Sequence, residues 1–273
     1  MTLWVLSVAL AAAHPDPSHT LAEIDAHLRA EPESTEWWVA KARVLMSVGQ
    51  QDEARAVLQE LCGKKPDDPD AEVAMAALEQ REGRMELAEK RCRAVVAKHR
   101  HHAEAWRTLA ECLERSGDGN GAREAAEKAL RFSEDTRPED FVKVASLCEE
   151  GGRFDEAVDW LEEGIHRHGC VMGLHFKASE IERQRGMPVR AVAHMDAVEA
   201  RYGPTVVTCE LKARIYSEAK MWLEAARMWD AALALLDALP VEERRSKLYE
   251  ISRSRFVNAR DDARSRLSGA EGK

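Results

Sequence analysis

The side chains best suited to chemistry in this sequence are imidazoles and thiols in two short polar stretches. They are His99, His101 and His102 in one stretch, and His166, His168 and Cys170 in the other. Imidazole and thiolate groups are ligands for zinc, copper and nickel. Neither stretch has two ligand pairs at the spacing of a structural zinc site, and both lie beside Lys and Arg residues. We therefore expect no metal site, and a metal-binding protein that uses these histidines is an alternative.

A glycine-rich stretch and pairs of adjacent carboxylates are the other candidates for a reaction centre. The stretch from Gly117 to Gly121 resembles a phosphate-binding loop, but such loops follow a β-strand and no strand-like pattern precedes this one. Adjacent acids such as Glu149 and Glu150 are ordinary on an acidic helical surface. No Ser or Cys lies in the sequence context of a known catalytic nucleophile. The sequence predicts no catalytic residue, no cofactor and no enzymatic activity.

The segments that carry these stretches repeat along the chain. An alanine recurs every 34 or 35 residues, and five residues before it lies a glycine, replaced by Lys220 before the last alanine. The alanines are Ala54, Ala88, Ala122, Ala157, Ala191 and Ala225, and the glycines are Gly49, Gly83, Gly117, Gly152 and Gly186. This period is typical of stacked units that cannot bury their apolar faces singly. An array of this kind builds a surface, and a reaction centre is not expected.

Each repeating unit divides into two amphipathic helices on either side of the glycine. In the third unit, Trp106, Leu109 and Leu113 precede Gly117 at helical spacing, and Ala122 follows it near the start of the second helix. Glycine permits the left-handed backbone that ends the first helix. The small alanine lets the two helix backbones approach closely, where a larger side chain would hold them apart.

These residues resemble the tetratricopeptide repeat (TPR). The family's first aromatic position holds Trp38, Glu72, Trp106, Phe141, His175 and Cys209, and its small position four residues later holds Ala42, Ala76, Ala110, Ala145, Ser179 and Ala213. The resemblance covers residues 35–237. It implies an all-α fold, a right-handed superhelical solenoid of about six TPR helix-turn-helix repeats with a capping helix at each end.

The register of the repeat predicts the domain boundaries. The repeats occupy residues 35–68, 69–102, 103–136, 138–171, 172–205 and 206–239. Residues 14–34 are expected to form an N-terminal capping helix. Residues 240–273 are expected to form a C-terminal capping helix and tail, with Leu248, Phe256 and Ala263 on its apolar face.

In the TPR family the first helix of each repeat lines a concave groove, so the resemblance implies which residues face a partner. They are Val39, Arg43, Val73, Arg107, Glu111, Val142, Ser146, Phe176, Glu180, Glu210 and Arg214. Apolar groups mixed with both signs of charge suit an extended or helical peptide, although the valines are also candidates for packing between repeats. Clamping of a chaperone's C-terminal carboxylate is not expected, because Glu104 at a matching position would repel it. We expect a non-catalytic scaffold that binds a protein or peptide.

The net charge and the distribution of apolar residues limit the other partners. A formal net charge of −9 disfavours non-specific binding of nucleic acid, which needs a basic surface. The longest apolar run, at the N-terminus, is too short to span a bilayer, so no stable membrane span is expected. The sequence leaves the oligomeric state open.

The first thirteen residues predict export. They are uncharged and largely apolar, and they end in Ala11–Ala13 directly before His14. This pattern resembles the hydrophobic region and the Ala-x-Ala cleavage site of a secretory signal peptide, so residues 1–13 are expected to be removed and the mature chain to be periplasmic. No Lys or Arg precedes the run, and Trp4 lies 34 residues before Trp38. The alternative is therefore a retained helix and a cytoplasmic adaptor.

Replacing Ala122 with Leu should destabilise the third repeat by about 1–3 kcal/mol, because the larger side chain overpacks the contact between the two helices. Urea or thermal unfolding of the variant beside the parent measures the effect. An unchanged melting curve would show that the alanine position is not a tight contact.

Overall fold

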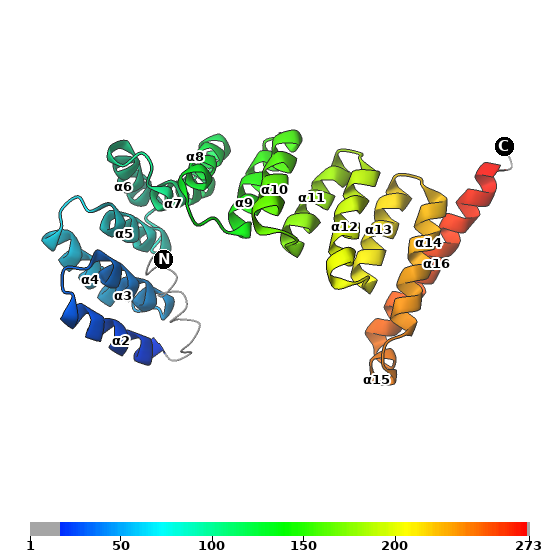
Figure 1. Ribbon diagram of the computed structural model, residues 1–273, viewed down its shortest axis with the longest axis horizontal. Helices are drawn as coiled ribbons and strands as arrows, with labels where there is room; N and C mark the ends of the chain where they lie inside the picture. The colour runs from blue at the N-terminus through cyan, green and yellow to red at the C-terminus, as the bar shows by residue number, and fades with distance from the viewer. Residues whose placement is uncertain (1–16, 272–273) are drawn as a thin grey trace. The chain divides into compact units, whose positions relative to one another are not determined.

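The computed structural model describes residues 17–271, and all the regular secondary structure in that range is α-helical. The predicted all-α fold is therefore confirmed. The predicted signal segment, residues 1–13, lies outside the described residues. The chain divides into two compact units, which we call unit 1 (up to Thr136) and unit 2 (from Arg137 onward). Figure 1 shows the helices in chain order, coloured from blue to red.

From residue 17 onward, unit 1 consists of a lone helix followed by three helix pairs. The lone helix is α2 (Pro17–Ala30), and the pairs are α3 (Thr35–Ser47) with α4 (Gln51–Lys64), α5 (Pro69–Arg81) with α6 (Met85–Lys98), and α7 (Ala103–Arg115) with α8 (Gly119–Phe132). Each of the first three repeat ranges derived from the sequence contains one of these pairs.

Unit 2 contains three further pairs and a terminal helix. The pairs are α9 (Pro138–Glu150) with α10 (Phe154–His168), α11 (Met172–Gln184) with α12 (Pro188–Tyr202), and α13 (Val206–Glu218) with α14 (Trp222–Asp237). A short helix, α15 (Val241–Arg244), precedes the long terminal helix α16 (Lys247–Glu271). The turn at Gly169 and the turn at Gly203 end α10 and α12, respectively, with a positive φ angle.

The repeated alanine lies where the two helices of a pair come close together. All six alanines of the repeat are fully buried, with no exposed surface. Full burial of so small a side chain means that atoms of neighbouring helices are packed directly around its backbone. Gly164 in α10 marks a second close approach, because a Cβ atom there would lie 2.8 Å from Cγ of Phe141 in α9 and 3.1 Å from Cδ2 of Leu174 in α11.

The turn between the helices of a pair uses a left-handed backbone. The five glycines predicted to end the first helices have φ angles between +70° and +84°. Lys220 occupies the same place in the sixth repeat and also has a positive φ, of +60°. An L-residue in this conformation has its Cβ close to the following carbonyl oxygen, which costs roughly 1–2 kcal/mol. The turn geometry is therefore kept in the repeat that lacks glycine.

The terminal helices cover the open ends of the two units. In unit 1, Ile24 of α2 is buried against Trp37 of α3. In unit 2, Phe256 of α16 is buried, with its ring centroid 5.2 Å from that of Trp229 in α14. Further along α16, Ala263 is buried against Ala225 and Ala226 of α14. The prediction that Leu248 shares this face was wrong, because 73% of the residue is exposed. In the first turn of α16 it is the next residue, Tyr249, that packs against the cluster of Trp229 and Phe256 and donates a hydrogen bond to Asp237 at 2.7 Å.

Replacing Lys220 with Gly should stabilise unit 2 by about 0.5–1 kcal/mol, because relief of the left-handed conformation exceeds the entropy that glycine adds to the unfolded chain. Gly117→Ala is the matched change in the opposite direction and should destabilise unit 1 by about 1 kcal/mol. No neighbouring atom lies within 4 Å of a Cβ built at Gly117, so only the backbone conformation is tested. Urea unfolding measures both effects, and a destabilised Lys220→Gly variant would contradict this explanation.

Candidate functional site

The first helices of unit 1 form a row in which α3 packs beside α5 and α5 beside α7. Across this row, Arg43 of α3 lies 3.4 Å from Glu104 of α7, which also pairs with Arg107. The predicted groove residues Val39 and Val73 are buried, with 8% and 3% of their surfaces exposed. Charged groups, and not these valines, therefore reach the surface of the row.

Unit 2 has a similar set of charges on its first helices. Glu180 accepts two hydrogen bonds from Arg183, at 2.6 and 3.0 Å, and these lower the pKa of its carboxyl group. Arg183 also pairs with Glu218 of α13 at 2.7 Å, and Gln184 donates a hydrogen bond to Glu149 of α9 at 2.7 Å. Of these residues only Glu180 was predicted from the sequence to line the groove, and Glu149 was predicted to be an ordinary surface acid. Arg183, Gln184 and Glu218 have partners on other first helices, and the pattern of a single repeat does not indicate such contacts.

The remaining predicted groove residues are distributed along α9, α11 and α13. Val142, Ser146 and Phe176 are half-buried, and Arg214 is exposed. Glu210 pairs with Arg255 of the terminal helix α16 at 2.9 Å. In unit 1, Glu111 on α7 is exposed. The assignment of all these positions to a ligand groove stays a prediction.

Two buried carboxylates occupy equivalent positions of repeats 2 and 5. Glu79 and Glu182 are almost fully buried. Glu79 accepts hydrogen bonds from Arg91 at 2.9 and 3.2 Å, and Glu182 pairs with Arg185 at 3.0 Å. Removing the arginine partner of either carboxylate would leave a buried charge unpaired, which is strongly destabilising. Neither carboxylate was predicted from the sequence.

Two histidines of the first polar stretch, His101 and His102, have structural partners. The Nδ1 atom of His102 accepts a hydrogen bond from the backbone N–H of Ala105 at 3.1 Å, so His102 caps α7. Its Nε2–H therefore donates to Asp70 at 3.1 Å, which lowers the pKa of that carboxyl group. The ring of His101 packs against Phe132 with a centroid distance of 4.7 Å.

The second stretch is also involved in packing. The ring of His168 meets the ring of Phe141 edge-on at 5.6 Å between centroids. The half-buried thiol of Cys170 lies 3.6 Å from the carbonyl oxygen of Ala197. Within residues 17–268, neither histidine stretch brings three ligand atoms within 4.8 Å of one another. Four cysteines, Cys92, Cys112, Cys148 and Cys209, are buried, and no disulfide joins any cysteines in the described part of the chain.

A pair of histidines that the sequence analysis did not connect lies inside repeat 5. His175 of α11 is buried, and its Nδ1 atom lies 3.4 Å from Nδ1 of His194 in α12. Burial lowers the pKa of both imidazoles. The positive charge of the neighbouring ring lowers the pKa of His175 further, whereas Glu162 opposes the shift at His194. The pair therefore favours the neutral form in the folded protein.

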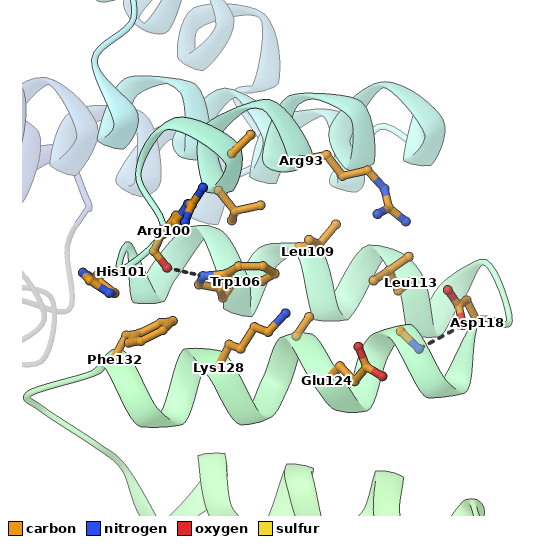
Figure 2. Close-up of a pocket in the computed structure, with 14 residues that line it drawn as sticks. Arg93, Arg100, His101, Trp106, Leu109, Leu113, Asp118, Glu124, Lys128 and Phe132 are labelled. Carbon is orange, nitrogen blue, oxygen red and sulfur yellow. Dashed lines mark hydrogen bonds between the residues drawn. The ribbon is translucent and has the colours of Figure 1, made fainter.

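Unit 1 contains a hollow between α6 and α8 with α7 as its floor. Its volume is about 590 Å³, a size typical of ligand pockets. Figure 2 shows the ring of Trp106 at its floor, with Leu109 and Leu113 further along the same helix. The indole N–H donates to the carbonyl oxygen of Arg100 at 2.7 Å, and the ammonium of Lys128 lies 4.5 Å from the ring centroid. We call this hollow the α6–α8 pocket.

Comparison with known protein families identifies the type of repeat. Two family models described as tetratricopeptide repeat match residues 35–78 and 80–139. These matches show tetratricopeptide repeats in residues 35–139, and together with the helix pairs, the buried alanines and the positive-φ turns they support a protein of the tetratricopeptide repeat family. The resemblance inferred from the sequence is therefore confirmed.

Solved TPR structures share this fold. YrrB, described as a TPR protein with an unusual peptide-binding site, is 15% identical; the match covers 66% of this chain and 93% of YrrB, with a TM-score of 0.54. PilF of Pseudomonas aeruginosa is 17% identical over 77% of this chain and 95% of its own, with a TM-score of 0.56. The C-terminal part of a TPR protein from Cytophaga hutchinsonii is 13% identical over 82% and 92%, with a TM-score of 0.60. No curated protein matched the sequence.

None of the described helices is both long and apolar enough to cross a membrane.

Lowering the pH should destabilise unit 2 through the histidine pair. The pKa values of His175 and His194 are lowered from 6.5 in the folded state, so at mildly acidic pH the unfolded chain binds more protons than the folded chain. The free energy of unfolding therefore falls as the pH decreases through the unfolded value. Phe141 occupies the equivalent position of repeat 4, so phenylalanine is the substitution chosen for His175. His175→Phe should weaken the dependence of the unfolding free energy on pH. Urea unfolding of both proteins between about pH 7.5 and about pH 5.5 measures it. Identical slopes would rule out a contribution from the pair.

Proposed function

We propose that this chain is an exported, non-catalytic scaffold that binds a peptide segment of a protein partner along its first helices. The TPR fold supports a protein-interaction scaffold. The observation that carries the finer proposal is the set of charges of both signs along the first helices of each unit. It includes Arg43, Glu104 and Arg107 in unit 1, and Glu180, Arg183 and Glu218 in unit 2.

These ion pairs are suited to exchange with a ligand. Arg43 and Glu104 are about one third exposed, and ion pairs near the surface contribute only about 0–1 kcal/mol. A peptide can therefore replace one partner at little cost and gain a charge-assisted hydrogen bond. The alternating signs would fix the register of the peptide, and binding would weaken as salt screens the charges.

Peptides selected from a random display library against the full chain provide the test. Arg43→Ala and Arg214→Ala should each weaken binding of the selected peptides by about threefold to tenfold, the loss typical of one charged contact. Lys90→Ala is the matched control, because Lys90 is an exposed cation on the second helix α6. Fluorescence anisotropy measures the affinities. Equal binding by the parent, Arg43→Ala and Arg214→Ala proteins would contradict binding along the first helices.

Export is proposed from the apolar N-terminal run. The intact mass of the protein from its native host distinguishes a mature chain that begins at His14 from one that retains Met1. A chain that begins at His14 supports an exported, periplasmic scaffold. A full-length mass would contradict export and favour the cytoplasmic adaptor.

A further inference from the structure

The α6–α8 pocket lies between second helices, outside the first-helix rows described above. Trp106 on its floor corresponds to Trp38 in repeat 1, and both indole N–H groups bond a carbonyl oxygen six residues earlier, at 2.7 and 2.8 Å. Trp38 is buried, with 8% of its surface exposed, whereas Trp106 is only half-buried. The tryptophan at this repeat position is therefore more exposed to solvent in repeat 3 than in repeat 1, and Trp106 lines the pocket.

Small side chains line the two walls of the pocket beside Trp106. Ala97 of α6 and Ala125 of α8 line the two walls, and Phe132 closes the end next to the ring (Figure 2). An apolar floor with an aromatic ring suits a large apolar side chain, which would lose its contact with water there.

The rim of the pocket is mainly basic on a protein of net charge −9. Arg93, Arg100 and Lys128 line it. Arg93 pairs with Glu89 at 2.8 Å, whereas Arg100 and Lys128 have no carboxylate partner among the described residues. Two acids, Asp118 and Glu124, lie at the end of the pocket away from Trp106 (Figure 2).

The two acids change this charge balance little. Asp118 already accepts a hydrogen bond from the backbone N–H of Gly121 at 2.9 Å, as the N-cap of α8. Glu124 lies 3.9 Å from the guanidinium of Arg123. The uncompensated charge at the aromatic end of the pocket is therefore positive.

We propose that the α6–α8 pocket binds an acidic segment of a partner protein and seats one large apolar side chain of that segment on Trp106. Lys128 covers the ring in the free protein, and its long exposed side chain can swing aside while its ammonium stays in water. The incoming side chain then stacks on the indole, and the carboxylates that flank it pair with Lys128 and Arg100. This site is independent of binding along the first helices.

Two peptides and four variants of the full chain test the site. The probe is the N-acetylated peptide amide Asp-Glu-Phe-Leu-Glu-Asp, and its twin carries Lys at each acidic position. Isothermal titration calorimetry should detect binding of the acidic peptide and not of the basic twin. Lys128→Glu, which reverses the charge at the rim, and Ala97→Leu, which fills the pocket from an exposed position, should each weaken binding by about tenfold or more.

The controls separate this site from general charge effects and from the first-helix rows. Lys90→Glu makes the same charge change on α6 but does not line the pocket, so it should change the affinity by less than about twofold. Arg43→Ala should leave it unchanged, and matching circular dichroism melts confirm that the variants are folded. The proposal is overturned if the acidic peptide does not bind at about 1 mM, or if Ala97→Leu binds it as tightly as the parent. It is also overturned if Arg43→Ala weakens binding and Ala97→Leu does not.

Discussion

The close contact between the two helices of each repeat determines the rest of the architecture. A fully buried alanine at the start of every second helix lets the helices of a pair meet at their backbones. Within each unit, these closely packed helix pairs stack on one another so that neighbouring first helices touch. The first helices then form the rows of α3, α5 and α7, and of α9 and α11. Contact among first helices brings charged residues together there. Where side chains on successive second helices are small, as at Ala97 and Ala125, space is left between them.

The turn at the end of each first helix shows that the repeat array tolerates a residue other than glycine in a left-handed backbone conformation. Glycine fits the left-handed conformation in five repeats, yet Lys220 adopts it in the sixth. The helices on either side hold the turn in place, because each repeat gains its stability from packing on its neighbours as well as from its own sequence. Gly164 illustrates the opposite case, since its constraint comes from side chains of two other helices. Backbone conformation at one position and space at the other both select glycine, for unrelated reasons.

The sequence was sufficient to predict the features that repeat. The spacing of Ala54 to Ala225 and of the glycines depends on contacts inside one helix pair, so each repeat provides an independent copy of the same signal. Features that arise between repeats occur once and give no such signal. The α6–α8 pocket needs small residues on two helices beside one tryptophan, and the pairing of Arg183 with Glu218 needs the long side chain of one repeat to reach the next repeat. Leu248 fits the helical period of α16 and is nevertheless exposed, because periodicity does not indicate where a helix meets its neighbour.

Both candidate binding surfaces consist of side chains on helices. We propose that this chain acts by holding a segment of another protein against its helices. Amide hydrogen exchange of the full chain, alone and with a saturating library-selected peptide, tests this claim most directly. The expected result is slower exchange confined to the first helices of a unit or to residues 93–132, with unchanged exchange in the other helices. Failure of every library peptide to bind, or protection confined to the loops between repeats, would contradict it.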